Sequence, residues 1–143
     1  MINLKKYHPK WSLISRLIRL RRANNRCEWC GVENGLIGRR RPSARAGEPS
    51  TFTPLAAEEQ EMIAKVVAEM LWRDKLRFYK RRGVTRIILT VAHIDRNRTN
   101  NRFHNLAALC QRCHLRHDGA QHLAARKYGR EWHSTVLPLP FTS

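Results

Sequence analysis

The chain has 143 residues, with 28 lysines and arginines against 11 aspartates and glutamates, so its formal net charge is +17. So much positive charge on a short chain opposes compaction unless a polyanion binds it, and nucleic acid is the expected polyanion. Hydrophobic residues make up 42% of the sequence, which is enough for a core and excludes a wholly disordered basic tail. The composition therefore predicts a single folded domain over 1–143 with an acidic partner.

Membrane and secretory segments are not expected. The longest uncharged apolar run, 87–92, is far shorter than the roughly 20 residues that a membrane span needs. Arginines interrupt the apolar stretch near the N-terminus, so it lacks the continuous apolar region of a secretory signal. We therefore expect an intracellular, cytoplasmic protein in a reducing compartment, where cysteines more often bind metals than form disulfides.

Apolar spacing predicts the elements of the first half of the chain. Spacings of three and four between Trp11 and Ala23 predict an amphipathic helix with a basic outer face. Residues 38–50 combine Gly, Pro, Ser and Arg without periodicity, which predicts a flexible basic loop. From about residue 53 to 82 the sequence predicts one long helix, with glutamates in its early turns and basic residues just before Gly83.

The second half predicts a strand, a loop, a second strand and a helix. Alternating apolar residues over 84–93 predict a strand, and the polar stretch 95–104 predicts a loop. Residues 105–109 fit a short second strand, and a helix is expected from Gln111 to about Tyr128, where Gly129 ends it. Residues 129–143, which include two prolines, are expected to form an irregular tail.

Two Cys-x-x-Cys pairs, Cys27/Cys30 and Cys110/Cys113, provide the strongest motif. Each pair can bind a metal from one turn, and four thiolates match the tetrahedral preference of a structural Zn²⁺ ion. The alternatives are four unrelated buried cysteines or a redox pair, but the redox interpretation needs a βαβ unit and only one strong strand is predicted. The spacing therefore favours a closed zinc site, which leaves no open position for catalysis.

The stretch around the second pair, VAHIDRNRTNNRFHNLAALCQRCHLRHD, resembles the HNH endonuclease family. His93 at the end of a strand, Asn105 after a polar loop and His114 directly after Cys113 follow the residue order of that family, with its flanking zinc knuckles. The resemblance covers roughly 10–37 and 85–128, and 38–84 looks like an insertion. It implies an α+β fold whose core, 85–128, is a ββα-metal, treble-clef-like unit that holds one divalent ion over a scissile phosphate.

The resemblance also implies a role for each motif residue. His93 would be the general base, since a neutral imidazole can take a proton from water near neutral pH. His114 would bind a catalytic Mg²⁺ or Mn²⁺ ion, which polarises a phosphate oxygen and stabilises the leaving 3′-oxygen. Asn105 would tie down the polar loop by side-chain hydrogen bonds and so fix His93.

One position departs from the pattern of the family. Members commonly place an Asp or a second His directly before the general base as a metal ligand, and this chain has Ala92 there. If the strand continues, Asp95 leaves the same face as His93, and Asp95 is therefore the first candidate for the missing carboxylate. His117 and Asp118 follow His114 by three and four residues, so either could share its helical face. Loss of catalysis is the other explanation.

Arginines near the motif are expected to contact phosphates with little sequence preference, namely Arg96, Arg98, Arg102, Arg112 and Arg116. The sequence thus favours a metal-dependent endonuclease of double-stranded DNA, resembling the small nucleases of phages, mobile elements and restriction systems. A catalytically inactive, zinc-stabilised DNA-binding module is the alternative that Ala92 suggests, and an RNA-binding or RNA-cleaving protein is a third. A monomer would nick DNA, whereas a homodimer or a protein partner would allow double-strand breaks. We expect no small-molecule ligand.

Overall fold

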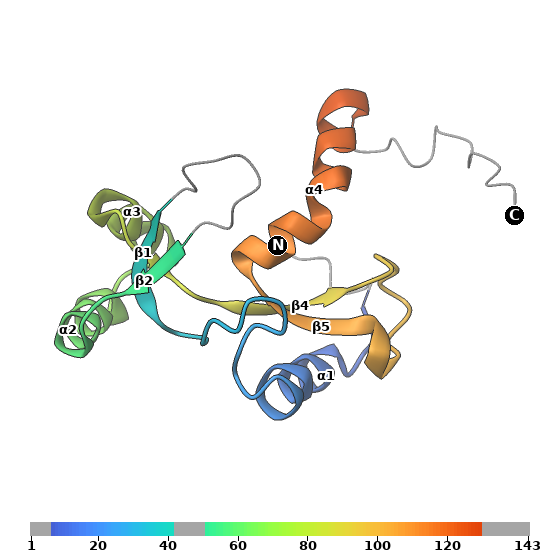
Figure 1. Cartoon of the computed structure of the whole chain (residues 1–143), viewed down its shortest axis with the longest axis horizontal. Helices are drawn as coiled ribbons and strands as arrows, with labels where there is room; N and C mark the ends of the chain where they lie inside the picture. The colour runs from blue at the N-terminus through green and yellow to red at the C-terminus, as the bar shows by residue number, and fades with distance from the viewer. Residues whose placement is uncertain (1–6, 42–50, 130–143) are drawn as a thin grey trace, which may run out of the picture.

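The computed structural model describes residues 7–41 and 51–129, which form a mixed α+β structure with two small antiparallel sheets. Figure 1 shows two groups of elements. The hairpin lobe contains the strands β4 (Leu89–His93) and β5 (Leu106–Cys110) between the helices α1 (Trp11–Leu17) and α4 (Gln111–Tyr128). The insertion lobe contains β1 (Ile37–Arg41), β2 (Thr51–Pro54), α2 (Ala57–Ala68), α3 (Trp72–Arg82) and β3 (Thr85–Arg86). The first four of these are labelled on the left in Figure 1.

The N-terminal helix forms as its apolar spacing predicts, but with a change of pitch. α1 ends at Leu17 and continues as a π-helical segment, η2, over Ile18–Arg22. The buried side chain of Ile18 packs on Leu106 and Ala108 of β5. Asn24 and Asn25 then take positive φ angles of 46° and 59°, which turns the chain away from the helix.

The hairpin lobe is built on the antiparallel pairing of β4 with β5, from Leu89 opposite Cys110 to His93 opposite Leu106. All five residues of β5 are buried because both faces of this strand are covered. Ala107 and Leu109 point to the core that contains the cysteines, and Leu106 and Ala108 point to η2. The helix predicted after this strand is confirmed as α4, and Gly129 follows it with a φ of 87°.

The predicted strand over 84–93 is wrong in its continuity. Residues Thr85–Arg86 form β3, which pairs with β1, and only Leu89–His93 pair with β5. The chain changes sheets between them, where the backbone N–H of Ile87 donates to the carbonyl of Leu36. Ile87 lies between the two strands and is fully buried in the core of the hairpin lobe. The alternation of apolar residues therefore continues through the break, and the sequence pattern does not reveal it.

The insertion lobe differs from the predicted loop and long helix. β1 (Ile37–Arg41) pairs with β2 (Thr51–Pro54) and β3, so the predicted loop is wrong at 38–41, and residues 42–50 lie outside the described residues. Gly38 permits this pairing, since a Cβ atom there would lie 2.4 Å from the carbonyl oxygen of Thr53.

The single long helix predicted up to residue 82 is two helices, α2 (Ala57–Ala68) and α3 (Trp72–Arg82). The chain leaves the helical conformation at Leu71, whose ψ angle is 151°. The break lets side chains of both helices reach one core, where Ile63 and Val67 of α2 contact Phe78 and Tyr79 of α3. This core, completed by Ile37 and Val84, is separate from the cores of the hairpin lobe.

In the part of the chain that the structure describes, no helix is long and apolar enough to cross a membrane. The irregular tail expected after Gly129 falls at 130–143, outside the described residues.

Candidate functional site

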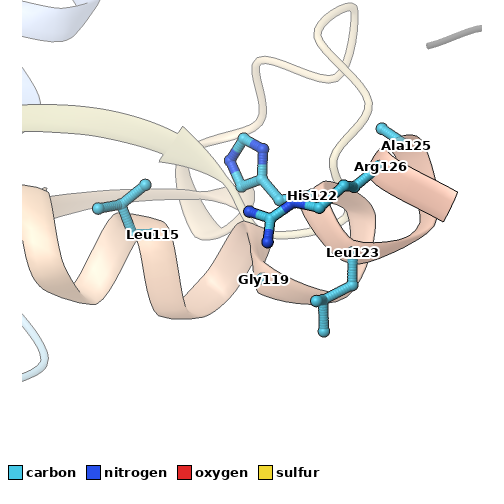
Figure 2. Close-up of a pocket in the computed structure, with 6 residues that line it drawn as sticks. All are labelled: Leu115, Gly119, His122, Leu123, Ala125 and Arg126. Carbon is cyan, nitrogen blue, oxygen red and sulfur yellow. The ribbon is translucent and has the colours of Figure 1, made fainter. Parts of the chain in front are cut away.

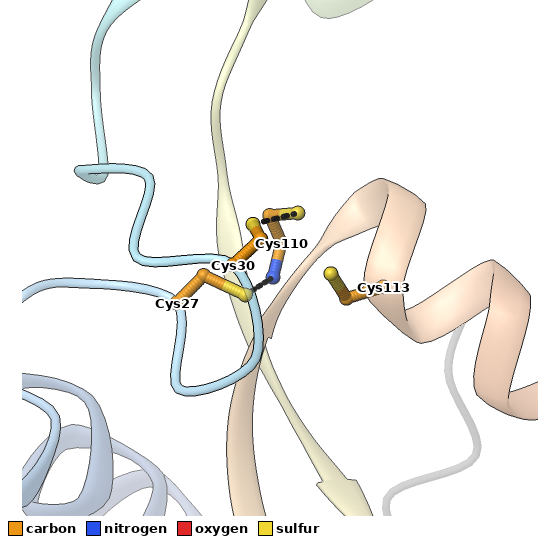
Figure 3. Close-up of side chains that lie close together, drawn as sticks. All are labelled: Cys27, Cys30, Cys110 and Cys113. Carbon is orange, nitrogen blue, oxygen red and sulfur yellow. Dashed lines mark hydrogen bonds between the residues drawn. The ribbon is translucent and has the colours of Figure 1, made fainter. Parts of the chain in front are cut away.

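The four cysteines come together from three elements. Cys27 and Cys30 lie in the turn after η2, Cys110 ends β5, and Cys113 lies in the first turn of α4 (Figure 3). Their sulfur atoms all lie within 4.8 Å of one another, and the Cys30 and Cys110 sulfurs are 3.7 Å apart. Zn–S bonds of about 2.3 Å in a tetrahedron would place the sulfurs about 3.8 Å apart. The four side chains can therefore bind a metal ion such as zinc.

The surroundings of the cysteines fit thiolate ligands. Burial raises the pKa of Cys27, but backbone N–H groups of Cys110, Cys30 and Trp29 outweigh burial and lower it from 9.0 to about 7. Burial raises the pKa of Cys30 and that of Cys113, where the other thiols add to the effect. Without a cation this low-dielectric cluster resists carrying four negative charges, and a divalent metal ion supplies the missing countercharge.

An ion pair that sequence analysis did not identify fixes the first knuckle against β5. The Glu28 carboxylate accepts a hydrogen bond from the backbone N–H of Ala108 and pairs with Arg22 at 2.7 Å. Arg22 also donates to the carbonyls of Phe103 and Leu106. Because Glu28 lies between the two cysteines of the pair, this contact sets the position of Cys27 and Cys30 on the strand.

A small pocket of about 120 Å³ beside β4 and α4 brings several predicted site residues together. Its lining includes His93 and Ala92 at the end of β4, the two arginines of the following loop, and His114 with Asp118 on α4. The complete lining is Tyr7, Val91, Ala92, His93, Arg96, Arg98, His114, Asp118 and Gln121. The pocket thus contains both histidines of the His93–Asn105–His114 motif and two cationic side chains.

His93 is buried and held in one orientation. Its ring stacks on Trp11 with centroids 4.9 Å apart and rings 17° from parallel. Its Nε2 atom lies 3.2 Å from Oδ1 of Asn101, and Asn101 donates its own Nδ2–H to the Thr99 carbonyl. That second bond directs the Asn101 oxygen toward His93, so in the neutral tautomer that fits this contact Nε2 carries the proton. Nδ1, which has no hydrogen-bond partner among the described residues, then carries the lone pair.

His114 and Asp118 form a second pair of donor atoms in the pocket. The Nδ1 atom of His114 lies 2.6 Å from the Thr90 hydroxyl, which fixes the ring. The Nε2 atom of His114 is 3.3 Å from Oδ2 of Asp118, one helical turn away. Imidazole nitrogen and carboxylate oxygen are both metal donors, and a ring held through its other nitrogen is the usual support of a histidine ligand.

The structure does not place His117 in this pocket. Its Nδ1 atom lies 2.7 Å from Oδ1 of Asp118 and its Nε2 atom lies 3.1 Å from the Ile94 carbonyl. Both nitrogens therefore contact oxygen acceptors, and neither is directed to a metal. His117 instead fixes the carboxylate of Asp118 and connects α4 to the end of β4.

Asp95 is likewise not among the residues that line the pocket. Its carboxylate accepts hydrogen bonds from the side chains of Asn100 and Asn105 and from the backbone of Asn97. The Asn100 amide is the largest influence that holds the pKa of Asp95 below its usual range, with further help from Asn105 and Asn97. Because the chain turns after β4, with the Arg96 N–H donating to the His93 carbonyl, Asp95 does not continue the face of His93.

Asn105 is buried at the centre of the loop between the strands. Its side-chain oxygen accepts from the Asp95 backbone N–H at 3.0 Å, and its amide donates to the Asp95 carboxylate and to the Asn100 carbonyl, each at 2.8 Å. These three bonds close the loop that carries Asn101, the hydrogen-bond partner of His93. Asn105 thus acts on His93 through the loop.

The arginines expected at a phosphate backbone lie in different places. Arg96 and Arg98 line the His93 pocket, and Arg96 is held there by a bond to the His117 carbonyl. Arg112 lines a different hollow, next to Cys30 and Arg40. Arg102 and Arg116 are exposed and line neither.

The histidines of the pocket are separate from a larger hollow along α4. That hollow, of about 620 Å³, lies along the outer part of the helix between Leu115 and Arg126, as Figure 2 shows. It contains one histidine, His122, and no carboxylate. Within the described residues, the four cysteines form the only group of three or more His, Cys, Asp or Glu side chains close enough to share one metal ion.

Comparison with known proteins adds no relative. No protein-family model matches the chain, and no curated protein or solved structure is significantly similar to it.

Proposed function

We propose that this protein is a metal-dependent endonuclease of the HNH type, which hydrolyses phosphodiester bonds of double-stranded DNA. The observation that carries the proposal is the pocket where His93, the His114–Asp118 pair and two arginines meet. A general base, two metal donors and cations for a phosphate are the parts that phosphodiester hydrolysis needs. The ββα-metal core of the proposal corresponds to β4, β5 and α4.

In this proposal His93 takes the proton from the attacking water through Nδ1. The Asn101 bond keeps the proton of the neutral ring on Nε2, and the Trp11 stack limits rotation of the ring. The water oxygen attacks phosphorus, the bond to the 3′-oxygen breaks, and a solvent proton neutralises the leaving oxygen. His93 returns its proton to solvent before the next turnover.

His114 and Asp118 would hold the catalytic Mg²⁺ or Mn²⁺ ion, with Nε2 and Oδ2 as donors. Two protein donors suffice, because such ions commonly keep several waters and take further oxygens from the substrate phosphate. When bound, the ion supplies stabilisation of the negative charge on the phosphate and the leaving oxygen. In this proposal Asp118, rather than the Asp95 predicted from the sequence, is the carboxylate ligand, and Asp95 and His117 become supporting residues.

Arg96 and Arg98 support DNA as the substrate, because each can contact a phosphate next to the cleaved bond. The net charge of +17 supplies further affinity that does not depend on sequence. The four cysteines would bind structural zinc and fix the start of α4, which carries His114 one residue after Cys113.

The alternative is a DNA-binding module without catalysis. Two observations favour it: Ala92 offers no donor atom in the pocket, and the described residues contain no second cluster of three metal-binding side chains. In that case the pocket would bind a phosphate through Arg96 and Arg98 and leave it uncut.

Supercoiled plasmid incubated with zinc-loaded protein separates the two functions. We expect nicked circles with Mg²⁺ or Mn²⁺ and none without added divalent ion; omitting the ion, rather than chelating it, keeps the zinc bound. A parallel binding measurement should show affinity for duplex DNA that falls steeply with salt. Binding without nicking in every metal would favour the module, and preferential competition by RNA duplex would favour an RNA substrate.

A further inference from the structure

An apolar groove lies on the insertion lobe, next to the start of α4. It encloses about 590 Å³ between α3, β3 and the start of β4 and α4. The lining residues include Trp72, Lys75, Leu76, Lys80, Arg86 and Ile88. Trp72, Leu76 and Ile88 are 66%, 59% and 52% exposed, so the groove presents an aromatic ring and two aliphatic side chains to solvent.

The charges around this groove match a polyanion. Lys75, Lys80 and Arg86 line it, and no carboxylate does. A groove that combines aromatic rings with cationic side chains suits a nucleic acid, because a base can stack on the ring while its phosphates contact the cations. In a duplex the faces of the bases are hidden by their neighbours, so only an unpaired or extruded base could enter.

The groove and the pocket lie along one face of α4. Gln111, His114, Asp118 and Gln121 follow one another at spacings of three, four and three residues, which places them on one face of the helix. Gln111 lines the groove, and the other three line the pocket. The Gln111 side chain is fixed there by bonds to the Arg86 carbonyl at 2.8 Å and to the Ile88 N–H at 3.2 Å. The segment 88–90, which leads into β4, connects the two sites in the same way, since Ile88 lines the groove and Thr90 contacts His114.

We propose that the groove of Trp72, Leu76 and Ile88 binds an unpaired base of the DNA strand whose phosphate lies in the His93 pocket. This inference rests on the proposed function for the identity of its ligand. It makes the insertion lobe a specificity element: DNA with an unpaired base near the scissile phosphate is preferred over continuous duplex.

The test uses binding of the full-length, zinc-loaded protein with no added divalent ion, so that cleavage does not enter the measurement. Three DNAs of equal length are compared: a duplex, the same duplex with one bulged 2-aminopurine, and the same duplex with an abasic bulge. Fluorescence anisotropy gives the dissociation constants, and 2-aminopurine fluorescence reports stacking on an aromatic ring. The variants are Trp72→Ala, Trp72→Phe and, as a matched control, Leu123→Ala, which removes an equally exposed apolar side chain on α4.

We expect the wild type to bind the base bulge about fivefold or more tightly than the abasic bulge, with quenching of the 2-aminopurine. Trp72→Ala should abolish both effects, whereas Trp72→Phe and Leu123→Ala should retain them. Equal affinity of the wild type for all three DNAs would overturn the inference and leave a protein segment as the occupant of the groove. If the wild type binds all three DNAs equally but still nicks plasmid, the proposed endonuclease function stands without this inference. If the wild type prefers the base bulge but does not nick plasmid, the groove binds a base and the proposed catalysis is contradicted.

Discussion

His93 illustrates how individual residues determine the chemistry of this pocket. Its ring is confined by Trp11 on one side and by Asn101 at Nε2, so a neutral ring exposes one defined nitrogen. The sequence identifies His93 through the order of the motif. It does not single out Asn101, because three other asparagines in the same loop, Asn97, Asn100 and Asn105, have the same chemistry.

Replacing Asn101 by Ala should lower the rate of plasmid nicking about tenfold to a hundredfold, since His93 loses the bond that fixes its tautomer and orientation. Zinc content and melting temperature should stay close to those of the wild type. Thr99→Ala is the matched control, because the Thr99 hydroxyl donates its hydrogen bond to Asn97 and not to Asn101 or His93. Wild-type activity in Asn101→Ala would show that His93 does not depend on this contact.

Asp95 shows why the missing carboxylate could not be placed from the sequence. The prediction required an extended strand beyond His93, but Arg96 takes a φ of 61° and closes a turn there. That left-handed conformation is uncommon for an arginine, and no glycine marks the turn in the sequence. Asp118 reaches the pocket instead through ordinary helical spacing from His114, a possibility that the sequence leaves open.

The lowered pKa of Asp95 predicts a pH-dependent contribution of the loop to stability. A carboxyl whose folded-state pKa is depressed stabilises the fold fully above its unfolded-state pKa of about 3.9 and ceases to do so as the pH falls through the folded-state value. Asp95→Asn removes this contribution. The difference in melting temperature between wild type and variant should therefore be constant above about pH 5 and shrink below about pH 4. Acid also protonates the cysteines, but it does so in both proteins, so this effect cancels when the two melting temperatures are subtracted. A difference that grows on acidification would contradict this role.

At the scale of elements, the sequence was most informative in the hairpin lobe after the polar loop. α4 and β5 lie within one residue of the bounds that periodicity and the Gly129 stop predict, whereas the strand predicted over 84–93 is divided between β3 and β4. The break between α2 and α3 was missed because neither Gly nor Pro occurs between Ala68 and Trp72, and only packing of both helices on one core requires it. The first strand was missed because Arg39, Arg40 and Arg41 have the composition of a loop.

Gly38→Ala should destabilise the insertion lobe by about 1–3 kcal/mol, because the new methyl group meets backbone atoms of Thr53 and Pro54 at 2.4 and 2.9 Å. Gly119→Ala is the opposite control. It lies within α4 with no heavy atom within 4 Å of the added Cβ, so it should stabilise the protein by up to about 1 kcal/mol. Chemical denaturation measures both, and a neutral Gly38→Ala would contradict the close approach of β1 and β2.

At the scale of the whole molecule, the two lobes have separate hydrophobic cores, and the cysteines belong to only one of them. Cys27, Cys110 and Cys113 are buried with Leu89 and Leu109, so a metal ion bound by the thiolates would be part of the core of the hairpin lobe. The core of the insertion lobe contains no cysteine; Phe52 of β2 packs against the cysteine core, but α2 and α3 do not contribute to it.

Removal of the metal should therefore unfold the hairpin lobe selectively. We expect one zinc ion per chain, and its chelation should lower the melting temperature and increase amide exchange in β4, β5 and α4 much more than in α2 and α3. Zinc addition should restore protection, whereas Cys113→Ser should behave as the chelated protein. Equal exchange in both lobes after chelation would argue against a structural metal in the cysteine cluster.

The most direct measurement of the central claim is plasmid nicking by wild type and His93→Ala side by side, with the zinc content of both determined. The account predicts metal-dependent nicking by the wild type and a loss of at least a hundredfold in His93→Ala at unchanged zinc content and DNA affinity. Equal nicking by the two proteins would contradict His93 as the general base, and no nicking by either would contradict the endonuclease.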